Sequence, residues 1–394
     1  MPTGRTTALI AVVLLTAACG GEGDDRASGG GTTGTSNATI STTISTTGPT
    51  AAGTSTTEPG ATAPTTTAPT MTAPPTVEAT APPTAAPSTT PPTSSEATEP
   101  ESAPTIRSII DSGAFMNLAH AGGDQASPHS TMFAFAEAVR AGATALELDV
   151  QLTADGVLIV QHDDTVDKTT EATGPVADLT LTEIQALDNA YWFSPDCWPC
   201  RDRPVDEYVY RGVRAGDVPP PTGHTAEDFR VETFRDVAEA YREMPLDIEI
   251  KGELPGAAAV ARQLALEIDE LERTDSVVVV SFDDAVVDVF HELAPEVAVS
   301  PGLGRLTDWF LGGAELEPHF EVLQLPPFRG EIQVVDADVV RRVHDEGRIV
   351  WVWPDDASTQ ENAEFYSRLI EYGVDGIIAG RPADATAALA DDTG

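Results

Sequence analysis

The sequence predicts an α/β fold, specifically a TIM-like (β/α)8 barrel with an insertion between its third and fourth strands. Three observations lead to this prediction. Short β-rich runs alternate with helical stretches after residue 105, a pattern typical of a mostly parallel sheet. The stretch 106–390 is long enough for one barrel, which commonly occupies about 250 residues. Titratable residues stand where successive strands end, and barrels gather their functional groups at that rim.

Nine runs have the composition of strands, one more than a barrel of eight needs. The pattern does not identify which run lies outside the barrel. Amphipathic helices are predicted between the runs, for example over 132–141, 233–242, 256–271 and 337–346. The predicted strands cover residues 115–120, 145–150, 157–162, 246–251, 277–282, 297–300, 322–325, 349–353 and 376–379.

The N-terminal segment is predicted to be a lipoprotein signal peptide over residues 1–18. Arg5 precedes an apolar run that is too short to span a bilayer but fits the central region of a signal peptide. The letters LTAA before Cys19 resemble a bacterial lipobox, so Cys19 is expected to become the lipidated first residue. The mature chain is therefore expected outside the cytoplasm, lipid-anchored to the bacterial cell membrane. An ordinary signal peptide with an incidental Cys19 is the alternative.

Residues 19–105 are predicted to be a disordered tether rich in Thr and Pro. This stretch has almost no aliphatic or aromatic side chains whose burial could offset the entropy of ordering it. Pro-rich chains extend by about 3.1 Å per residue, so the tether could hold the folded domain well away from the membrane.

The charge balance excludes simple nucleic-acid binding. The chain carries 63 acidic and 22 basic side chains, a formal net charge of -41, and this surface repels a polyanion. A small-molecule ligand is expected instead, and nothing in the sequence indicates the oligomeric state.

Four consecutive predicted strands carry titratable residues toward their ends. Side chains alternate between the two faces of a strand, so Glu147 and Asp149 share one face. Three converging carboxylates repel one another unless a cation holds them, and an all-oxygen set suits Ca²⁺ or Mg²⁺. A buried ion-pair network around a lysine is the alternative. In chain order the residues are His120, then Glu147 and Asp149, then His162 and Asp163, then Glu249 and Lys251.

Six motifs in this region resemble those of the glycerophosphodiester phosphodiesterase family in order and spacing. The resemblance covers roughly residues 113–390. It implies a barrel that hydrolyses glycerophosphodiesters to glycerol 3-phosphate and an alcohol, with a divalent cation, Ca²⁺ or Mg²⁺. The motifs read HAG at 120–122, PHST at 128–131, ELD at 147–149, TADG at 153–156, HD at 162–163 and EIK at 249–251.

The resemblance also implies roles for individual residues. His120 and His162 would act as general acid and base, because the departing alcohol needs a proton and the attacking oxygen must lose one. Lys251 would add positive charge next to the phosphate, and Trp353 is expected to contact the substrate. The metal ligands would be Glu147, Asp149 and Glu249.

Two positions depart from the family pattern. Ala121 stands where the family has an arginine that contacts phosphate, and His129 stands where it has a glutamate. Loss of a guanidinium removes a bidentate phosphate contact, so another cation must replace it or the substrate differs. His129 is predicted to bind substrate, with a surface loop position as the alternative. A phospholipase D-like or phosphoinositide phospholipase C-like enzyme, or a non-catalytic lipoprotein that binds phosphorylated polyol, also fits the pattern.

The predicted insertion, residues 189–230, is rich in aromatic residues and arginine. Loops of this kind at a catalytic rim act as lids or substrate walls, and a self-packed surface excursion is the alternative. Cys197 and Cys200 are predicted to form a local disulfide, since the exterior is oxidising. The arginines that could replace the charge missing at Ala121 are Arg201, Arg203, Arg211 and Arg214.

Overall fold

The structure, a computed structural model, describes residues 103–195 and 200–392. The predicted signal peptide, Cys19, nearly all of the predicted tether and Cys197 lie outside the described residues. None of the helices in the described part has the length and apolarity that a membrane crossing needs.

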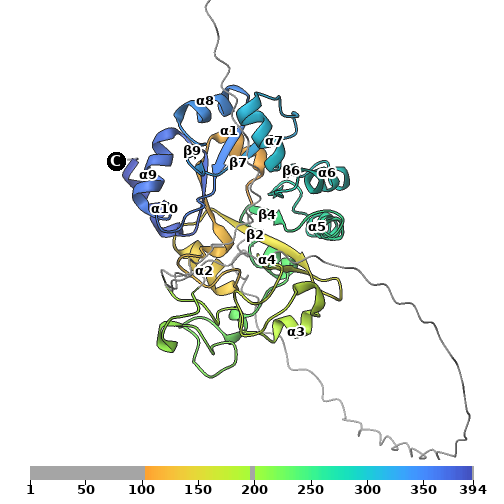
Figure 1. Cartoon of the computed structure of the whole chain (residues 1–394), viewed down its shortest axis with the longest axis vertical. Coiled ribbons are helices and arrows are strands. Elements are labelled where there is room, and N and C mark those ends of the chain that lie inside the picture. Colours follow the sequence, from red (N-terminus) through yellow and green to blue (C-terminus); the bar gives the residue numbers. More distant parts are fainter. Residues whose placement is uncertain (1–102, 196–199, 393–394) are drawn as a thin grey trace, which may run out of the picture. The chain divides into compact units, whose positions relative to one another are not determined.

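Eight parallel strands form a nearly closed barrel, which confirms the predicted fold (Figure 1). Hydrogen-bonded neighbours follow the order β6-β5-β4-β2-β1-β11-β10-β7. A parallel bridge between Val299 and Phe320 brings the two ends of this order together. The strands are β1 (Met116–Ala119), β2 (Ala145–Leu152), β4 (Leu246–Ile250), β5 (Val277–Val280), β6 (Ala298–Val299), β7 (Val322–Leu325), β10 (Ile349–Val352) and β11 (Gly376–Ala379).

The predicted strand that lies outside the barrel is the third in chain order, residues 157–162. This is β3 (Leu158–Val160), which pairs antiparallel with the end of β2. The loop between them, residues 153–157, is far shorter than the dozen or so residues that a parallel crossover needs. The chain then makes its long excursion between the third and fourth strands in chain order, which separates barrel neighbours β2 and β4. A small hairpin of β8 (Phe328–Arg329) and β9 (Ile332–Gln333) was not predicted.

Helices surround the sheet, and several begin at a side-chain cap that the sequence provides. Thr131 accepts from the backbone of Ala134 at the start of α2, and Asn362 accepts from Phe365 at the start of α9. The α-helices are α1 (Ile106–Ser112), α2 (Met132–Arg140), α3 (Leu181–Gln185), α4 (Phe234–Ala240), α5 (Ala257–Glu270), α6 (Asp284–Leu293), α7 (Leu303–Thr307), α8 (Ala337–Asp345), α9 (Ala363–Tyr372) and α10 (Pro382–Asp392). Shorter turns are η1 (His120–Gly122), η2 (Val176–Asp178), η3 (Val205–Glu207), η4 (Ala226–Phe229) and η5 (Asp308–Gly312).

The inside of the barrel is apolar at its N-terminal end. Inward-facing Leu118, Val278 and Trp351 form one buried cluster with Ile106 and Ile109 of α1. The outward faces of the strands pack separately against the surrounding helices. Because apolar side chains fill the N-terminal end, polar groups inside the barrel lie toward the carboxyl ends of the strands.

Candidate active site

Four inward-facing carboxylates line neighbouring strands β2 and β4. Glu147 is paired in register with Asp247, and Asp149 with Glu249. Glu147, Asp149 and Asp247 are buried, while Glu249 is half-buried. Asp247 was not among the predicted site residues, although it shares a strand face with Glu249 by the same alternation that identified Glu147 and Asp149.

Lys251 supplies the positive charge closest to these acids. Its Nζ lies 2.9 Å from Glu249 Oε1 and 3.4 Å from Asp149 Oδ1. Burial alone would raise the pKa of Asp149, but Lys251 and the nearby histidines hold it well below its usual range. The ion-pair network considered as an alternative is therefore present, within the same residue set as the predicted metal ligands.

The donor chemistry of these acids fits a hard divalent cation. Both carboxylate oxygens of Asp149 are buried with no hydrogen-bond partner, and such atoms are costly to leave unsatisfied. The predicted ligands offer only oxygen donors, as Ca²⁺ and Mg²⁺ prefer. Within the described residues, no group of three Asp, Glu, His or Cys side chains is already gathered for a metal ion. The ligand set of Glu147, Asp149 and Glu249 stays a prediction.

Three histidines meet beside the carboxylates. His120 begins η1 directly after β1, and His162 follows β3. The ring of His129 lies between them, with centroids 6.5 Å from His120 and 5.6 Å from His162. His162 lies at this rim because β3 pairs antiparallel with β2, although β3 itself is not a barrel strand.

His120 is held in a negative environment. Its Nδ1 lies 3.3 Å from Asp124 Oδ1. Burial would lower the pKa of His120, but Asp124, Glu147 and Asp149 together raise it well above its ordinary value. These carboxylates therefore favour the protonated form of His120. Asp124 was not predicted from the sequence, because a loop places it and no strand or helix periodicity marks it.

His162 is fixed by its neighbour and by β2. Its Nδ1 lies 2.6 Å from Asp163 Oδ1, so Nε2 is the nitrogen left for proton transfer. Gln151 on β2 donates to the backbone carbonyls of Gln161, His162 and Asp163 at 2.8, 3.1 and 2.6 Å. These bonds fasten the segment that carries His162 to the barrel.

His129 is buried, so the surface-loop alternative is wrong. Its Nδ1 lies 2.8 Å from Ser130 Oγ, and its carbonyl accepts from Asn189 Nδ2 at 3.1 Å. Burial, followed by the neighbouring His162, lowers the pKa of His129 to about 3. The imidazole is therefore neutral at physiological pH. The sequence prediction that it contacts substrate remains a prediction.

Ala121 contacts the site through its backbone, and any residue except proline could make the same contact at this position. Its N–H donates to Glu147 Oε2 at 2.7 Å, and its φ of 44° is in the left-handed region. Its side chain is completely buried, so an arginine there would need its neighbours to move. Lys168 brings a positive charge close to His162, since its Nζ lies 3.5 Å from Asp163 Oδ1 and Asp163 also binds His162.

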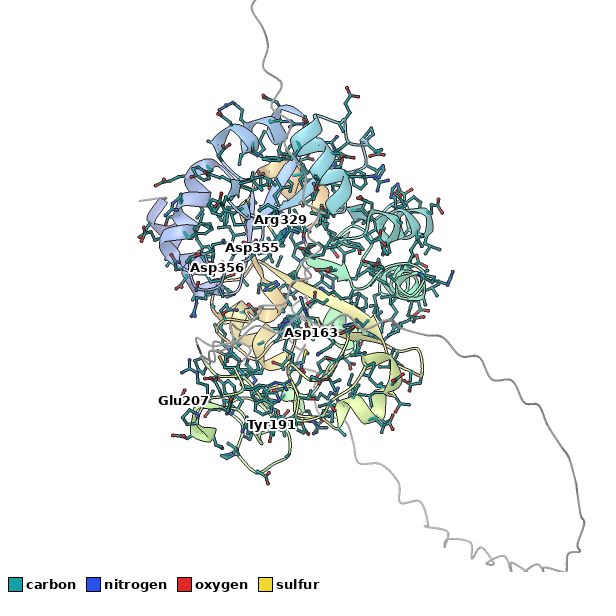
Figure 2. The ribbon with its side chains drawn as sticks, in the orientation of Figure 1. Asp163, Tyr191, Glu207, Arg329, Asp355 and Asp356 are labelled. Atoms are coloured by element: carbon teal, nitrogen blue, oxygen red, sulfur yellow. The ribbon has the colours of Figure 1, made fainter. Side chains whose placement is uncertain are left out.

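The arginines of the insertion pack within the insertion and against its neighbours in the contacts described. The guanidinium of Arg211 lies 4.2, 4.6 and 3.8 Å from the ring centroids of Tyr191, Trp192 and Tyr208. Arg214 binds Glu227 and the carbonyl of Gln185, Arg203 binds Glu207, and Arg201 binds the carbonyl of Asp167. These contacts support the self-packed alternative. Figure 2 shows Tyr191 and Glu207 in this insertion, with Asp163 between it and the barrel.

Cys200 is disulfide-bonded. Its predicted partner, Cys197, lies outside the described residues, so the pairing itself remains a prediction.

Trp353 follows β10 at the carboxyl rim, where it meets Phe282. The two ring centroids are 5.6 Å apart at 77°. Phe282 follows β5, and strands β6 and β7 stand between β5 and β10, so this pair spans one side of the rim. We call Phe282 and Trp353 the aromatic wall. The position suits the predicted substrate contact of Trp353.

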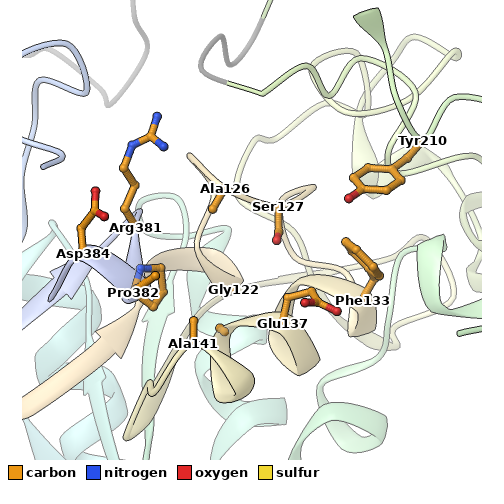
Figure 3. A pocket seen from close by; sticks show the side chains of 12 residues that line it. Gly122, Ala126, Ser127, Phe133, Glu137, Ala141, Tyr210, Arg381, Pro382 and Asp384 are labelled. Carbon is orange, nitrogen blue, oxygen red and sulfur yellow. The ribbon is translucent and has the colours of Figure 1, made fainter. Parts of the chain in front are cut away.

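A cavity of 290 Å³ lies next to η1 but is separate from these groups (Figure 3). Its lining includes Gly122, Ser127, Phe133, Tyr210 and Arg381, and none of the predicted catalytic or metal-binding residues. The predicted catalytic and metal-binding residues therefore lie outside this cavity.

Comparison with known proteins agrees with this arrangement. Residues 120–384 match the model of the glycerophosphoryl diester phosphodiesterase family. A glycerophosphodiester phosphodiesterase of Caldanaerobacter subterraneus is 29% identical, covering 67% of this chain and 93% of that protein.

Two solved structures share the fold. A glycerophosphodiester phosphodiesterase from Agrobacterium tumefaciens has a TM-score of 0.50 at 22% identity, covering 68% of this chain and 97% of that one. A phosphodiesterase from Oleispira antarctica, solved with its product sn-glycerol-3-phosphate, has a TM-score of 0.51 at 18% identity, covering 71% and 99%. With the family model matched over most of the chain, this protein belongs to the glycerophosphoryl diester phosphodiesterase family and is a phosphoric diester hydrolase.

Proposed function

We propose that the chain hydrolyses glycerophosphodiesters to glycerol 3-phosphate and an alcohol, with the help of a divalent cation. The observation that carries this proposal is the meeting of three histidines with four carboxylates at the ends of β1, β2 and β4. The product bound in the Oleispira antarctica relative, sn-glycerol-3-phosphate, is the phosphate compound that this reaction would release.

Glu147, Asp149 and Glu249 would hold the cation, Ca²⁺ or Mg²⁺. When bound, it would neutralise the anionic oxygens of the phosphodiester, which otherwise repel a nucleophile. The oxygens of Asp149 support this assignment, since they are buried and accept no hydrogen bond from the described atoms.

The acid and base roles follow from the surroundings of the two histidines. The carboxylates around His120 favour its protonated form, so it can give its proton to the departing alkoxide as the phosphorus–oxygen bond breaks. His162, with Nδ1 held by Asp163, can accept at Nε2 the proton that the attacking oxygen loses. One proton enters and one leaves, and the two histidines return to their starting states by exchange with water.

Lys251, His129 and Trp353 would contact the substrate. Lys251 would add positive charge next to the phosphate. A neutral His129 can donate one hydrogen bond without adding charge, and Trp353 would pack against the apolar part of the glycerol or alcohol. Lys168 is the candidate replacement for the arginine absent at Ala121.

The reaction is proposed to take place at the cell surface. Cys19 would be lipidated after removal of residues 1–18, and residues 19–105 would hold the barrel away from the membrane. A disulfide between Cys197 and Cys200 suits an oxidising exterior.

The test is release of glycerol phosphate from a panel of glycerophosphodiesters by the full chain, with Ca²⁺, Mg²⁺ or EDTA. Turnover should disappear with EDTA and in His162→Ala. His344→Ala is the matched control, because His344 lies on α8 and pairs with Asp375 away from these groups. Binding of the cation without turnover on any substrate would favour the non-catalytic lipoprotein instead.

A further inference from the structure

Two further buried acids, Asp124 and Glu361, lie near His120. Glu361 has no role in the reaction described above. Glu361 precedes α9 and is only 7% exposed. Its Oε2 accepts from the backbone N–H of Gly380 at 2.9 Å and from the hydroxyl of Tyr366 on α9. Two donors on one oxygen fix the orientation of this carboxyl group.

Gly380 brings Glu361 close to the partner of His120. Strands β1 and β11 are in register through Ala119 and Ala379, so His120 and Gly380 follow side by side. A Cβ atom at Gly380 would lie 2.6 Å from Asp124 Oδ1 and 3.0 Å from Glu361 Cδ. The two carboxyl groups therefore face each other across the space that this glycine leaves open.

The same Asp124 oxygen faces the catalytic imidazole. Asp124 Oδ1 is 3.3 Å from His120 Nδ1 and has no other hydrogen-bond partner among the described atoms. Tyr366 therefore contacts Glu361, and Asp124 contacts His120, while the two carboxyl groups both lie beside Gly380.

Two facing buried carboxyl groups resist being charged together. Burial would raise the pKa of Asp124, but His120 lowers it, so Asp124 is the charged member of the pair. Burial, followed by the charge of Asp124, raises the pKa of Glu361 to about 7. The titratable groups that face Glu361 are Asp124 and His120 from the loop after β1 and Tyr366 from α9.

We propose that Glu361 is a positioning residue for His120, acting through Asp124 by adding or withholding a second negative charge beside the imidazolium. This rests on the proposed role of His120 as general acid. While Glu361 carries its proton, Asp124, Glu147 and Asp149 are the charges that oppose release of the His120 proton. Once Glu361 is ionised, the added negative charge makes His120 a weaker acid.

The test compares Glu361→Gln with the unmodified full chain. Glutamine keeps an oxygen that can accept from Gly380 and Tyr366, but it cannot become charged. The pH at which His120 loses its proton should fall by about half a unit to one unit, as expected when a nearby negative charge that favours the imidazolium is removed. This is measured by NMR titration of the imidazole signals, with His120 assigned from the signal lost in His120→Asn. The pH profile of kcat/KM should shift on its alkaline side in the same direction.

Tyr366→Phe provides a second, independent variant. Without the donated hydroxyl, the ionised form of Glu361 is less favoured, so the titration of His120 should shift downward by a smaller amount. Glu267→Gln is the matched control, because Glu267 is also a buried acid but lies on α5 with Gln263 and Arg235. It should leave the titration of His120 unchanged.

The outcomes separate this proposal from the proposed reaction. An unchanged His120 titration in both Glu361→Gln and Tyr366→Phe would overturn the positioning role, whatever happens to turnover. A shifted titration supports it. If that shift leaves the pH profile of kcat/KM unmoved, the positioning role stands and the assignment of His120 as general acid fails.

Discussion

The two sides of the barrel rim differ in chemistry. The ends of β1, β2 and β4 carry the histidines, the four carboxylates and Lys251, whereas the ends of β5 and β10 carry the aromatic wall of Phe282 and Trp353. On the charged side, neighbouring strands place acids opposite acids, so the repulsion between the carboxylates must be offset by nearby positive charge. On the other side, the two rings meet edge to face and carry no charge, and Phe282 is 37% exposed. A low-dielectric wall strengthens the electrostatic interactions opposite it, so the two sides are complementary parts of one site.

The largest effect is expected from breaking the charged side at Asp149. Asp149→Asn removes the carboxylate whose buried oxygens accept no hydrogen bond, so the cation should no longer be held. Lewis-acid stabilisation contributes several kcal/mol, so kcat/KM should fall by about 1,000-fold or more. Calorimetric titration with Ca²⁺ or Mg²⁺ gives a readout that does not depend on turnover.

The matched control for that variant is Asp356→Asn. Asp356 is an exposed acid in the loop after β10, on the same side of the rim as Trp353, and its carboxylate binds Ser358 and Thr359. It should leave both cation binding and turnover unchanged. Equal cation affinity in Asp149→Asn and the unmodified chain would remove Asp149 from the ligand set.

The next effect is on stability and concerns Asp247. Burial, followed by the charges of Glu249 and Asp149, raises the pKa of Asp247 to about 7. The folded chain therefore keeps this proton to a higher pH than the unfolded chain, whose value is near 3.8. The contribution to stability is complete below about pH 4 and is lost as pH rises through 7.

Asp247→Asn should remove that loss, because asparagine does not titrate and can still accept from Gln324. At pH 8 with EDTA, the free energy of unfolding should increase by on the order of 3 kcal/mol. At pH 4 the two proteins should be similar. Urea unfolding at both pH values measures this, and a gain of the same size at pH 4 would show that titration is not the cause.

The alternation of side chains along a strand predicted two of the four carboxylates on the charged side. The same rule could also have predicted Asp247. It placed Glu147 and Asp149 on one face, and applied to β4 it also identifies Asp247. The position of β3 was predictable too, because only residues 153–157 separate it from β2 and a parallel crossover does not fit there. In both cases the signal was present in the sequence.

The acids behind His120 could not be predicted in this way. Asp124 and Glu361 lie in loops far apart in the chain, and they meet because β1 pairs with β11 and Gly380 has no side chain between them. The insertion is similar, since the sequence cannot show that Arg211 will pack against three rings of its own segment. Contacts between irregular segments depend on tertiary packing, which the periodicity of the sequence does not predict.

A smaller effect is expected on the aromatic side. Trp353→Ala removes the ring that meets Phe282, and a lost aromatic contact is typically worth about 1 kcal/mol or more beyond the buried area. KM should rise about 10-fold with a smaller change in kcat, because the proposed packing of this ring on substrate would act on the ground state and the transition state alike. Steady-state kinetics on one glycerophosphodiester measures both. A fall in kcat without a change in KM would place Trp353 among the groups that act in the transition state.

The smallest effect tests whether Lys168 replaces the charge missing at Ala121. Lys168 lies at the edge of the charged side, and its partner Asp163 also binds His162. Partly exposed ion pairs contribute about 0.2–1 kcal/mol, so Lys168→Met should raise KM by about two- to fivefold at low salt. The difference should shrink at high ionic strength, since salt screens an exposed charge more than a buried one. A KM that is unchanged at low salt would leave Lys251 as the phosphate-binding cation and show that this enzyme tolerates the loss of the arginine without replacing it.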